Sequence, residues 1–564
     1  MMDAAKTTFL PLNRSDVDLG NSVYTSRNDT WRALVALNGE IGSNWRWDTY
    51  YQFGETKGRE QGKQRLEQRW RDAVDAVFVT AQYVGTSGLT IGSIVCRTTL
   101  SSPANGCVPA NVMGAGTVRP ATVAWVIADS WQTPRFRQHS MAANLRGTLL
   151  DGWAGPILAA AGIEYRTNLS EGDADANSKA GLFQSVNSTV LPTLTQKVVE
   201  GYAEINVPIF KDAPIGKSFE VDGAIRRTHY SLSGNATTWK VGAVYQLNDE
   251  YMLRVTRSRD IRAPSPQELN PNTRVTALSQ ADPKHGIQYI IPAVIGGNPN
   301  LNLEKANTFT IGAVFKPNWL PRLRVSIDYY DIKVDSAIDI ISIPLAVTVC
   351  RKGSYPDVCT IGTDSAGNTD RILRLFAIYQ NVNQLHAQGF ELVSSYSLPL
   401  ADGDLNFSVN ANYINTLSTT LPDGSVQEFA DVKGNSGSVT TIFGVPKWRT
   451  DAVITYARPT WSITTQLRYI PAGILNRNWF GPQDSGYNPY LKDSVSNNRI
   501  GSCLYVNLNG KVKLYGEGDH KVELFGGINN LFDRDPPANL RFTGNGLYFD
   551  PIGRSFKIGV RADW

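Results

Sequence analysis

Strict alternation of apolar and polar residues at the C-terminus constrains the fold of this chain more than any other feature. Phe556, Ile558, Val560, Ala562 and Trp564 form one apolar row, and polar or small residues occupy the positions between them. Side chains alternate across a β-strand, so the pattern predicts one amphipathic strand with an aromatic end. Such an edge promotes aggregation in a soluble protein, whereas a closed barrel in an outer membrane removes it. The pattern therefore predicts a transmembrane β-barrel, provided that the rest of the chain supplies the other strands.

The same two-residue period recurs along the chain. It is clearest in four segments: 308–315, 322–329, 403–413 and 461–469. Beyond Tyr330 the apolar phase shifts to Ile332 and Val334, which indicates a bulge or the point where that strand leaves the membrane. Counting gives roughly seventeen antiparallel strands, the first near Thr30–Ile41 and the last at Arg554–Trp564.

The connections between these strands alternate in length. Short turns are expected at 151–154, 211–217, 248–250, 317–321, 401–403, 458–460 and 515–518. Longer connections are expected at about 61–135, 171–194, 264–303, 338–377, 417–445, 475–500 and 531–552, with the short 233–237 as the exception in that set. This alternation is typical of an outer-membrane barrel, with short periplasmic turns and long extracellular loops.

Composition agrees with an all-β membrane protein. Of 564 residues, 10% are aromatic, 49 are glycine and only 19% are charged, which suits many strands, glycine turns and aromatic girdles. No stretch approaches the ~20 apolar residues of a membrane helix. A formal charge of +4 without a dense Lys/Arg run gives no support for nucleic-acid binding. A soluble sandwich or propeller is the alternative, but the strand pairs show no fixed repeat of ~40 residues.

The N-terminus does not fit an intact outer-membrane protein. Residues 1–18 contain no apolar segment like that of a signal peptide, which such a protein needs. The first expected strand descends like the last, so we expect residues 1–29 to be the remnant of an extracellular loop and 30–564 a partial barrel. On this interpretation, the chain starts partway through a barrel.

The cysteines form two close pairs, Cys96/Cys107 and Cys350/Cys359, and leave Cys503 over. Both pairs lie in expected loops, which favours local disulfides in an oxidising compartment, and four free thiols are the alternative. Zinc is disfavoured because neither pair is C-x-x-C and no histidine lies near either pair. We expect no metal site and no cofactor.

Several segments resemble the TonB-dependent outer-membrane receptor family. Arg259–Leu269 (RDIRAPSPQEL) resembles its R-x-x-R-A-P-S-x-x-E-L segment, and Gly297–Ala306 (GNPNLNLEKA) resembles its G-N-P-x-L-x-P-E-x-S segment. Asp328–Ile332 (DYYDI) and Gly527–Pro537 (GINNLFDRDPP) resemble two further strand and turn motifs. The motif residues that we single out are Arg259, Arg262, Pro264, Glu268, Asn298, Pro299, Asn529, Asn530, Leu531, Phe532 and Trp564.

The resemblance implies a barrel of twenty-two strands, an N-terminal plug and a short box that binds TonB. Neither the plug nor the box is recognisable, and five strands are unaccounted for. The segment from Cys96 through Cys107-Val108-Pro109 resembles an extracellular-loop motif of the family, which supports the first disulfide. The resemblance also implies three partners: outer-membrane lipid, a small solute, and TonB with its inner-membrane energising complex, the last only through the missing plug.

Most motif residues are expected to have architectural roles. Short polar side chains at Asn529, Asn530 and Asp533 suit a turn. Arg259, Arg262 and Glu268 are expected to form a charge network at the rim or in the lumen, with contact to a plug as the alternative.

Solute contacts are expected in the long loops. The segment 475–500 contains the aromatics Trp479, Phe480, Tyr487 and Tyr490, which stack on sugars or aromatic chelates, or else pack the loop on itself. No nucleophile, metal or nucleotide-binding motif of an enzyme is present, so we expect no catalysis.

The sequence is compatible with three functions. The first is a Gram-negative outer-membrane receptor for TonB-dependent uptake of a scarce solute, such as an iron chelate or an oligosaccharide, which lacks energy coupling in this plug-less form. The second is a passive pore or adhesin with a similar barrel. The third is a soluble β-rich carbohydrate-binding protein.

Overall fold

The structure is a computed structural model of the whole chain. It describes residues 17–83, 88–184, 190–271, 273–282, 284–353, 358–364, 367–432, 444–491, 493–517, 520–537 and 548–563. Trp564, the expected aromatic end of the last strand, lies outside the described residues. No helix among the described residues has the length and apolar character needed to cross a membrane.

Seventeen long strands dominate the described part of the chain. They are β1 (Tyr24–Ile41), β2 (Trp45–Arg65), β5 (Ile127–Gly152), β6 (Gly155–Ala174), β7 (Leu191–Ala213), β8 (Gly216–Tyr230), β9 (Gly234–Gln246), β10 (Tyr251–Arg262), β13 (Glu304–Phe315), β14 (Arg324–Ile340), β16 (Arg371–Leu400), β17 (Gly403–Thr420), β19 (Trp448–Ala457), β20 (Trp461–Ile470), β23 (Cys503–Glu517), β24 (His520–Asn529) and β25 (Ser555–Asp563).

Shorter elements lie before β1 and in the long connections. They are η1 (Val17–Leu19), α2 (Glu67–Val74), β3 (Ala76–Phe78), η2 (Ala81–Tyr83), β4 (Ile94–Cys96), α4 (Arg97–Ser101), α5 (Pro120–Val126), α6 (Ala176–Lys179), β11 (Thr273–Asp282), β12 (Ile287–Gly296), α7 (Ile343–Lys352), β15 (Cys359–Gly362), β18 (Val426–Glu428), β21 (Gly473–Ile474) and β22 (Arg499–Ile500).

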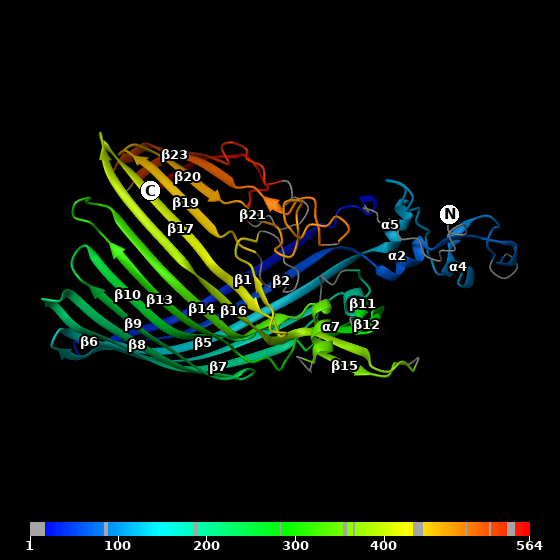
Figure 1. Ribbon diagram of the computed structural model, residues 1–564, viewed down its shortest axis with the longest axis horizontal. Helices are drawn as coiled ribbons and strands as arrows, with labels where there is room; N and C mark the ends of the chain where they lie inside the picture. Colours follow the sequence, from blue (N-terminus) through cyan, green and yellow to red (C-terminus); the bar gives the residue numbers. More distant parts are fainter. Residues whose placement is uncertain are drawn as a thin grey trace. The chain divides into compact units, whose positions relative to one another are not determined.

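The chain divides into two compact units. Unit 1 comprises residues 1–35, 51–141 and 166–196, and unit 2 comprises residues 36–50, 142–165 and 197–564. In unit 2 the strands from β7 to β25 pair antiparallel with their neighbours in sequence order, except where a long connection carries its own elements. Figure 1 shows β8, β9, β10, β13, β14, β16 and β17 side by side. The parallel pair β12–β16 belongs to a loop.

One face of the unit 2 sheet carries exposed apolar side chains. Along one row Val255 pairs with Ile311, Ile311 with Tyr329, and Tyr329 with Phe390. Other exposed members on this face include Ile205, Ile225, Val241, Leu253, Ile327 and Ile463. Aromatic pairs border the apolar rows. Two pairs lie at the strand ends that carry short turns: Tyr251–Phe315, with ring centroids 5.0 Å apart, and Tyr456–Trp461, at 5.4 Å. Two more pairs lie nearer the long loops: Tyr329–Phe390, at 5.3 Å, and Tyr413–Trp448, at 4.4 Å.

The opposite face of the same sheet is polar, and some of its side chains cross over glycines. Arg254, Gly312 and Asp328 are in register on β10, β13 and β14, and the Arg254 Nε–Asp328 Oδ1 distance is 2.8 Å. A Cβ on Gly312 would overlap Asp328 Oδ1, so the ion pair occupies the space that a side chain would need. Tyr202 similarly passes over Gly162 to donate to Asn144 at 2.9 Å.

Unit 1 has the same two-sided character. Three polar residues, Gln52, Gln138 and Asn168, form a hydrogen-bonded ladder across β2, β5 and β6, with distances of 3.4 and 2.9 Å. The neighbouring positions carry an aromatic row on the other face. The long connection between β2 and β5 packs its own small core from Ala73, Ala110 and Val126, to which α2 and α5 contribute.

Two boundaries differ from the sequence predictions. The first strand begins at Tyr24 rather than near Thr30, and the origin of the residues before it as an extracellular loop stays a prediction. Pairing of β14 continues without interruption through Tyr330 and Ile332, so no bulge lies there, and the alternative that the strand leaves the membrane at this point stays a prediction. The register shift follows at Val334–Ala337, where Ser336 adopts a positive φ of 56°.

Candidate functional site

The first family motif builds a charge network at the end of β10. Arg262 donates to Glu268 at 2.9 and 3.0 Å and to Glu304 at 2.5 and 2.7 Å. Glu304 also accepts from the backbone N–H of Ile338 at 2.6 Å. Arg259 lies apart from this network and donates to Asn307 at 3.1 Å. The structure thus brings Arg262 and Glu268 together, adds Glu304 and leaves Arg259 out.

The turn after β10 is closed by the same motif. Glu268 accepts from the backbone N–H of Ser265 at 2.6 Å, and the Ser265 hydroxyl accepts from the Glu268 N–H at 3.3 Å, a capping-box arrangement. Burial raises the pKa of the Glu268 carboxyl, but the bonds from Arg262 and Ser265 outweigh burial and lower that pKa below its ordinary value. Pro264 is buried beside this turn. The turn is therefore held by charge-assisted bonds.

The second motif joins the first through backbone contacts. The N–H of Asn298 donates to the Glu268 carbonyl at 2.7 Å, and the Asn298 side chain donates to the Tyr379 carbonyl at 3.0 Å. A Cβ on Gly297 would overlap the Asn270 carbonyl oxygen, so glycine permits this close approach. Pro299 is exposed. These motif residues tie the 263–303 connection to the sheet.

The C-terminal motif forms a tight turn after β24. Asn530 is 1% exposed, and its amide accepts from Arg534 N–H at 2.8 Å and donates to the Arg534 carbonyl at 3.1 Å. Asn529 donates to Ser555 at 3.3 Å, and the Leu531 N–H bonds to Val506. Phe532 lies within this turn and is 70% exposed. The two asparagines thus lie in a turn, as their residue types suggest.

The four candidate aromatics of the 471–502 connection divide into two groups. Trp479 packs against a core that contains Leu475, Ile500 and Phe549, and Phe480 lies on Gly486, where a Cβ would be 2.5 Å from its ring. These two side chains pack the loop on itself. Tyr487 is half-buried, whereas Tyr490 is 93% exposed and accessible to a solute.

Disulfides and a buried ion pair hold the long connections. Cys96 is bonded to Cys107, and Cys350 is bonded to Cys359, the pairs expected from the sequence. In unit 2, α7 and β12 pack against β16 through a core that includes Ile291, Val349 and Leu375. Beside this core Arg351 forks onto the fully buried Asp282. Figure 1 shows α7, β11, β12 and β15 together at one end of β14 and β16.

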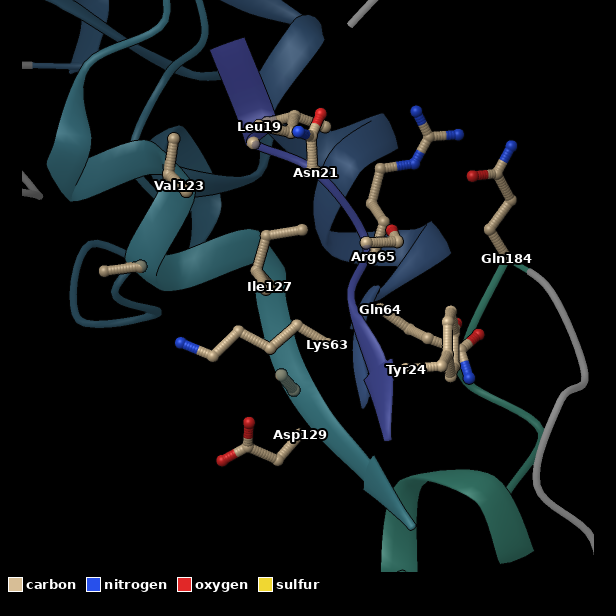
Figure 2. A pocket seen from close by; sticks show the side chains of 14 residues that line it. Leu19, Asn21, Tyr24, Lys63, Gln64, Arg65, Val123, Ile127, Asp129 and Gln184 are labelled. Carbon is tan, nitrogen blue, oxygen red and sulfur yellow. The ribbon is translucent and has the colours of Figure 1, made fainter. Parts of the chain in front are cut away.

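A cavity of about 780 Å³ opens in unit 1. The start of β1, the end of β2, α5 and the start of β5 line it, with Leu19, Asn21, Tyr24, Lys63, Gln64, Arg65, Val123, Ile127, Asp129 and Gln184 among its residues. Figure 2 shows Lys63 and Asp129 on one side, and Tyr24, Gln64 and Gln184 on the other. No sequence motif pointed to this cavity, because its lining comes from several separate segments.

Gln64 gives the cavity a specific chemical character. The residue is 5% exposed, and its Nε2 donates to Ser130 at 2.9 Å. Its Oε1 has no hydrogen-bond partner among the described residues, and leaving a buried acceptor unpaired costs about 1–3 kcal/mol. This oxygen has less than 1 Å² of exposed surface, so a hydroxyl or amide donor of a solute reaches it after the Gln64 side chain turns toward the cavity.

The described residues contain no group of three or more His, Cys, Asp and Glu side chains that could hold a metal ion. The chemistry that the cavity offers is that of the hydrogen bonds and charges of its lining residues.

Comparison with known proteins identifies the fold. The family model described as TonB dependent receptor-like, beta-barrel matches residues 5–531. No curated protein matches the chain in sequence. The siderophore receptor PirA from Acinetobacter baumannii is similar in structure, with a TM-score of 0.51 at 12% identity over 96% of this chain and 79% of that chain. The RagAB peptide transporter gives a TM-score of 0.54 at 12% identity over 96% of this chain and 62% of that chain.

These matches agree with the all-β antiparallel fold class predicted from the sequence, which is confirmed. Members of this family are outer-membrane transporters rather than enzymes. Because the family model covers most of its length, the chain belongs to the TonB dependent receptor-like, beta-barrel family.

Proposed function

We propose that this chain is the barrel part of an outer-membrane receptor that binds a small solute for uptake. The observation that carries the proposal is the two-faced sheet. Exposed apolar rows bordered by aromatics cover one face, and ion pairs such as Arg254–Asp328 lie on the other. This is the surface that a barrel needs between lipid and a wet interior.

The solute we propose is an iron chelate, an oligosaccharide or a molecule of similar size and polarity. The cavity around Gln64 supports this class, because it offers a buried acceptor, a cation at Lys63 and a carboxylate at Asp129. The exposed Tyr490 offers a stacking surface on a second loop. A pocket with few convergent polar groups is the expected form of a small-molecule site.

We further propose that the 564 residues by themselves are not driven by TonB. In this family coupling passes through a plug and a TonB box, and neither sequence is recognisable within residues 1–564. A passive pore is the competing function, and a stable open channel in planar bilayers would favour it.

The location is tested by expressing the 564-residue chain behind a cleavable signal peptide in a Gram-negative host. We expect it in the outer-membrane fraction, soluble only in detergent, with gel mobility that changes on heating. Recovery of folded chain in the soluble periplasmic fraction would overturn the proposal.

Solute binding is tested by calorimetry on the detergent-purified chain with a ferric catecholate, a ferric hydroxamate and a maltohexaose. We expect one of these probes to bind, and Gln64→Leu to weaken that binding about tenfold, the effect of one lost hydrogen bond. Gln138→Leu, which removes an amide of the polar ladder outside the cavity, is the control. Equal affinities of the two variants for the bound probe would show that the cavity is not the binding site.

Coupling is tested by uptake of the bound probe in hosts with and without TonB. We expect the same uptake in both hosts. Uptake that depends on TonB would contradict the uncoupled state.

A further inference from the structure

An aromatic row marks one level on the outer face of unit 1. Trp31 and Phe53 have ring centroids 4.6 Å apart, Phe53 lies 4.8 Å from His139, and the Tyr51 hydroxyl is 2.8 Å from His139 Nδ1. Trp31 and Tyr51 are exposed. Amphipathic rings gather where lipid chains meet headgroups. This row therefore places the headgroup level at the residues next to it on the side of the long β2–β5 connection. These are Glu55 and Lys57 in β2 and Arg137 and Arg135 in β5.

A cluster of cations occupies that next level. Arg135 donates to Glu55 at 2.9 and 2.6 Å, Arg137 donates to the same carboxylate at 3.3 and 3.2 Å, and Lys57 lies 3.3 Å from it. Trp31 Nε1, from the aromatic row, also reaches Glu55 at 3.4 Å. The cations and the aromatic row thus form one continuous surface.

The positive charge of this surface exceeds its negative charge. Lys57, Arg59, Arg135 and Arg137 carry four positive charges against the two carboxylates Glu55 and Glu171. Glu55 is 6% exposed and lies beneath the cations, whereas the Lys57 side chain is 61% exposed. Arg59 lies over the Trp131 ring at 5.6 Å. An ammonium has three donors, so Lys57 retains donors for a second anion.

The location of these cations on the outer face indicates which kind of anion they meet. The alternate residues of the same strands form the amide ladder of Gln52, Gln138 and Asn168, so the cations point away from that polar face. Just above an aromatic belt, long cationic side chains meet the headgroups of lipids, and each is worth about tenfold or less in affinity for an anionic surface. Guanidinium donors match phosphate oxygens, and Arg59 bonds to Gln61 through its Nε, whereas the forks of Arg135 and Arg137 lie on Glu55.

We infer that Lys57 and Arg59 bind the phosphate groups of a phosphorylated glycolipid in the outer leaflet, and that Arg135 and Arg137 add positive charge beside them. The inference rests on the proposed outer-membrane location. Glu55 acts here as a positioning residue: it holds Arg135 and Arg137 at the headgroup level and leaves Lys57 and Arg59 facing the lipid.

Native mass spectrometry of the detergent-purified full chain tests the inference, with lipid A, dephosphorylated lipid A and phosphatidylethanolamine as probes. The test variant is Lys57→Gln/Arg59→Gln, which leaves both arginines on Glu55. The matched control is Lys211→Gln/Lys316→Gln, which removes two charges beside short turns. We expect lipid A affinity at low salt to fall about 10- to 30-fold in the test variant and to stay unchanged in the control.

Equal lipid A binding by wild type and test variant would overturn the inference, as would equal binding of the dephosphorylated lipid. Displacement of lipid A by millimolar inorganic phosphate would also overturn it, in favour of a free-anion site. Heat-dependent gel mobility of every variant is measured in parallel. A chain that fails to enter the membrane at all defeats the proposed function, whereas a folded membrane chain without lipid selectivity defeats only this inference.

Discussion

Two glycines of the unit 2 sheet differ in what lies next to them. Gly312 lies beneath the Arg254–Asp328 pair, and a Cβ there would overlap the carboxylate. Gly510 in β23 lies on the apolar face of the same sheet, in register with Ile463, and a Cβ there would meet the Ser462 carbonyl oxygen at an ordinary 3.8 Å. The first glycine makes room for an ion pair, whereas the second does not.

We predict that Gly312→Ala lowers the free energy of unfolding by an amount on the order of 1 kcal/mol, because the methyl group displaces the ion pair. Thermal unfolding of the purified chain, followed by gel mobility, measures the effect. Gly510→Ala is the control and should unfold at the wild-type temperature. Equal shifts in both variants would show that strand glycines act only through backbone freedom.

Arg262 is predicted to matter more than Arg259, although both belong to one motif. Arg262→Met leaves Glu268 and Glu304, whose side chains are 12% and 10% exposed, without their shared cation. Breaking a fully buried ion pair lowers the free energy of unfolding by about 3–5 kcal/mol, and the loss is smaller for this partly exposed pair. We expect faster proteolysis within 263–303 and a lower unfolding temperature. Arg259→Met removes one exposed bond and is the control. The prediction fails if the two variants behave alike.

At the scale of single residues, the sequence predicted the roles of the motif residues but not all of the contacts between them. It placed Arg262, Glu268, Asn529 and Asn530 in architectural roles, and their contacts agree with that interpretation. It did not pair Glu304 with Arg262, because the two are forty-two positions apart and only the β10–β13 register aligns them. The cavity at Gln64 was missed for the same reason.

At the scale of elements, strand boundaries followed from periodicity and loop contents did not. The predicted connection 264–303 matches the gap between β10 and β13 closely. Inside the connections, α7 begins at Ile343 after Ser342, with a proline in its first turn, and ends before Gly353 at a φ of +65°. Those are local helix signals, but the alternating pattern that revealed the strands does not detect them.

The part of unit 2 formed by α7, β11, β12 and β15 is predicted to lose stability at low pH. Burial raises the pKa of Asp282, but bonds from Arg351, the Lys284 N–H and Tyr289 outweigh it and hold that pKa below its ordinary value. A lowered folded-state pKa contributes stability that is present above the unfolded value of about 4 and is lost as the pH falls through the folded value.

We therefore expect amide hydrogen exchange in α7 and β12, corrected for the intrinsic effect of pH on exchange, to be slow at about pH 5 and above and to accelerate below about pH 4. The disulfide between Cys350 and Cys359 remains intact throughout and limits the opening. Asp282→Asn should remove most of the change across this window. A corrected exchange rate that does not vary with pH in the wild type would contradict this role of the carboxylate.

At the scale of the whole molecule, the two faces of the sheet differ in polarity. Apolar side chains that a soluble protein would bury are exposed on one face, among them Leu253, Ile311 and Ile327 at nearly half of their surface. Ion pairs and amides lie on the other. Sequence periodicity predicted this division because strand side chains alternate, but it could not supply the register that aligns the rows across strands.

Spin-label accessibility at two adjacent positions of β13 tests that claim most directly. Labels are placed at Ile311→Cys and Thr310→Cys of the chain in lipid vesicles, with the buried Cys503 replaced by alanine. We predict that the label at 311 collides mainly with dissolved oxygen, as in lipid, and that the label at 310 collides mainly with a water-soluble nickel chelate. Equal access of the nickel chelate to both labels would contradict a lipid-facing sheet.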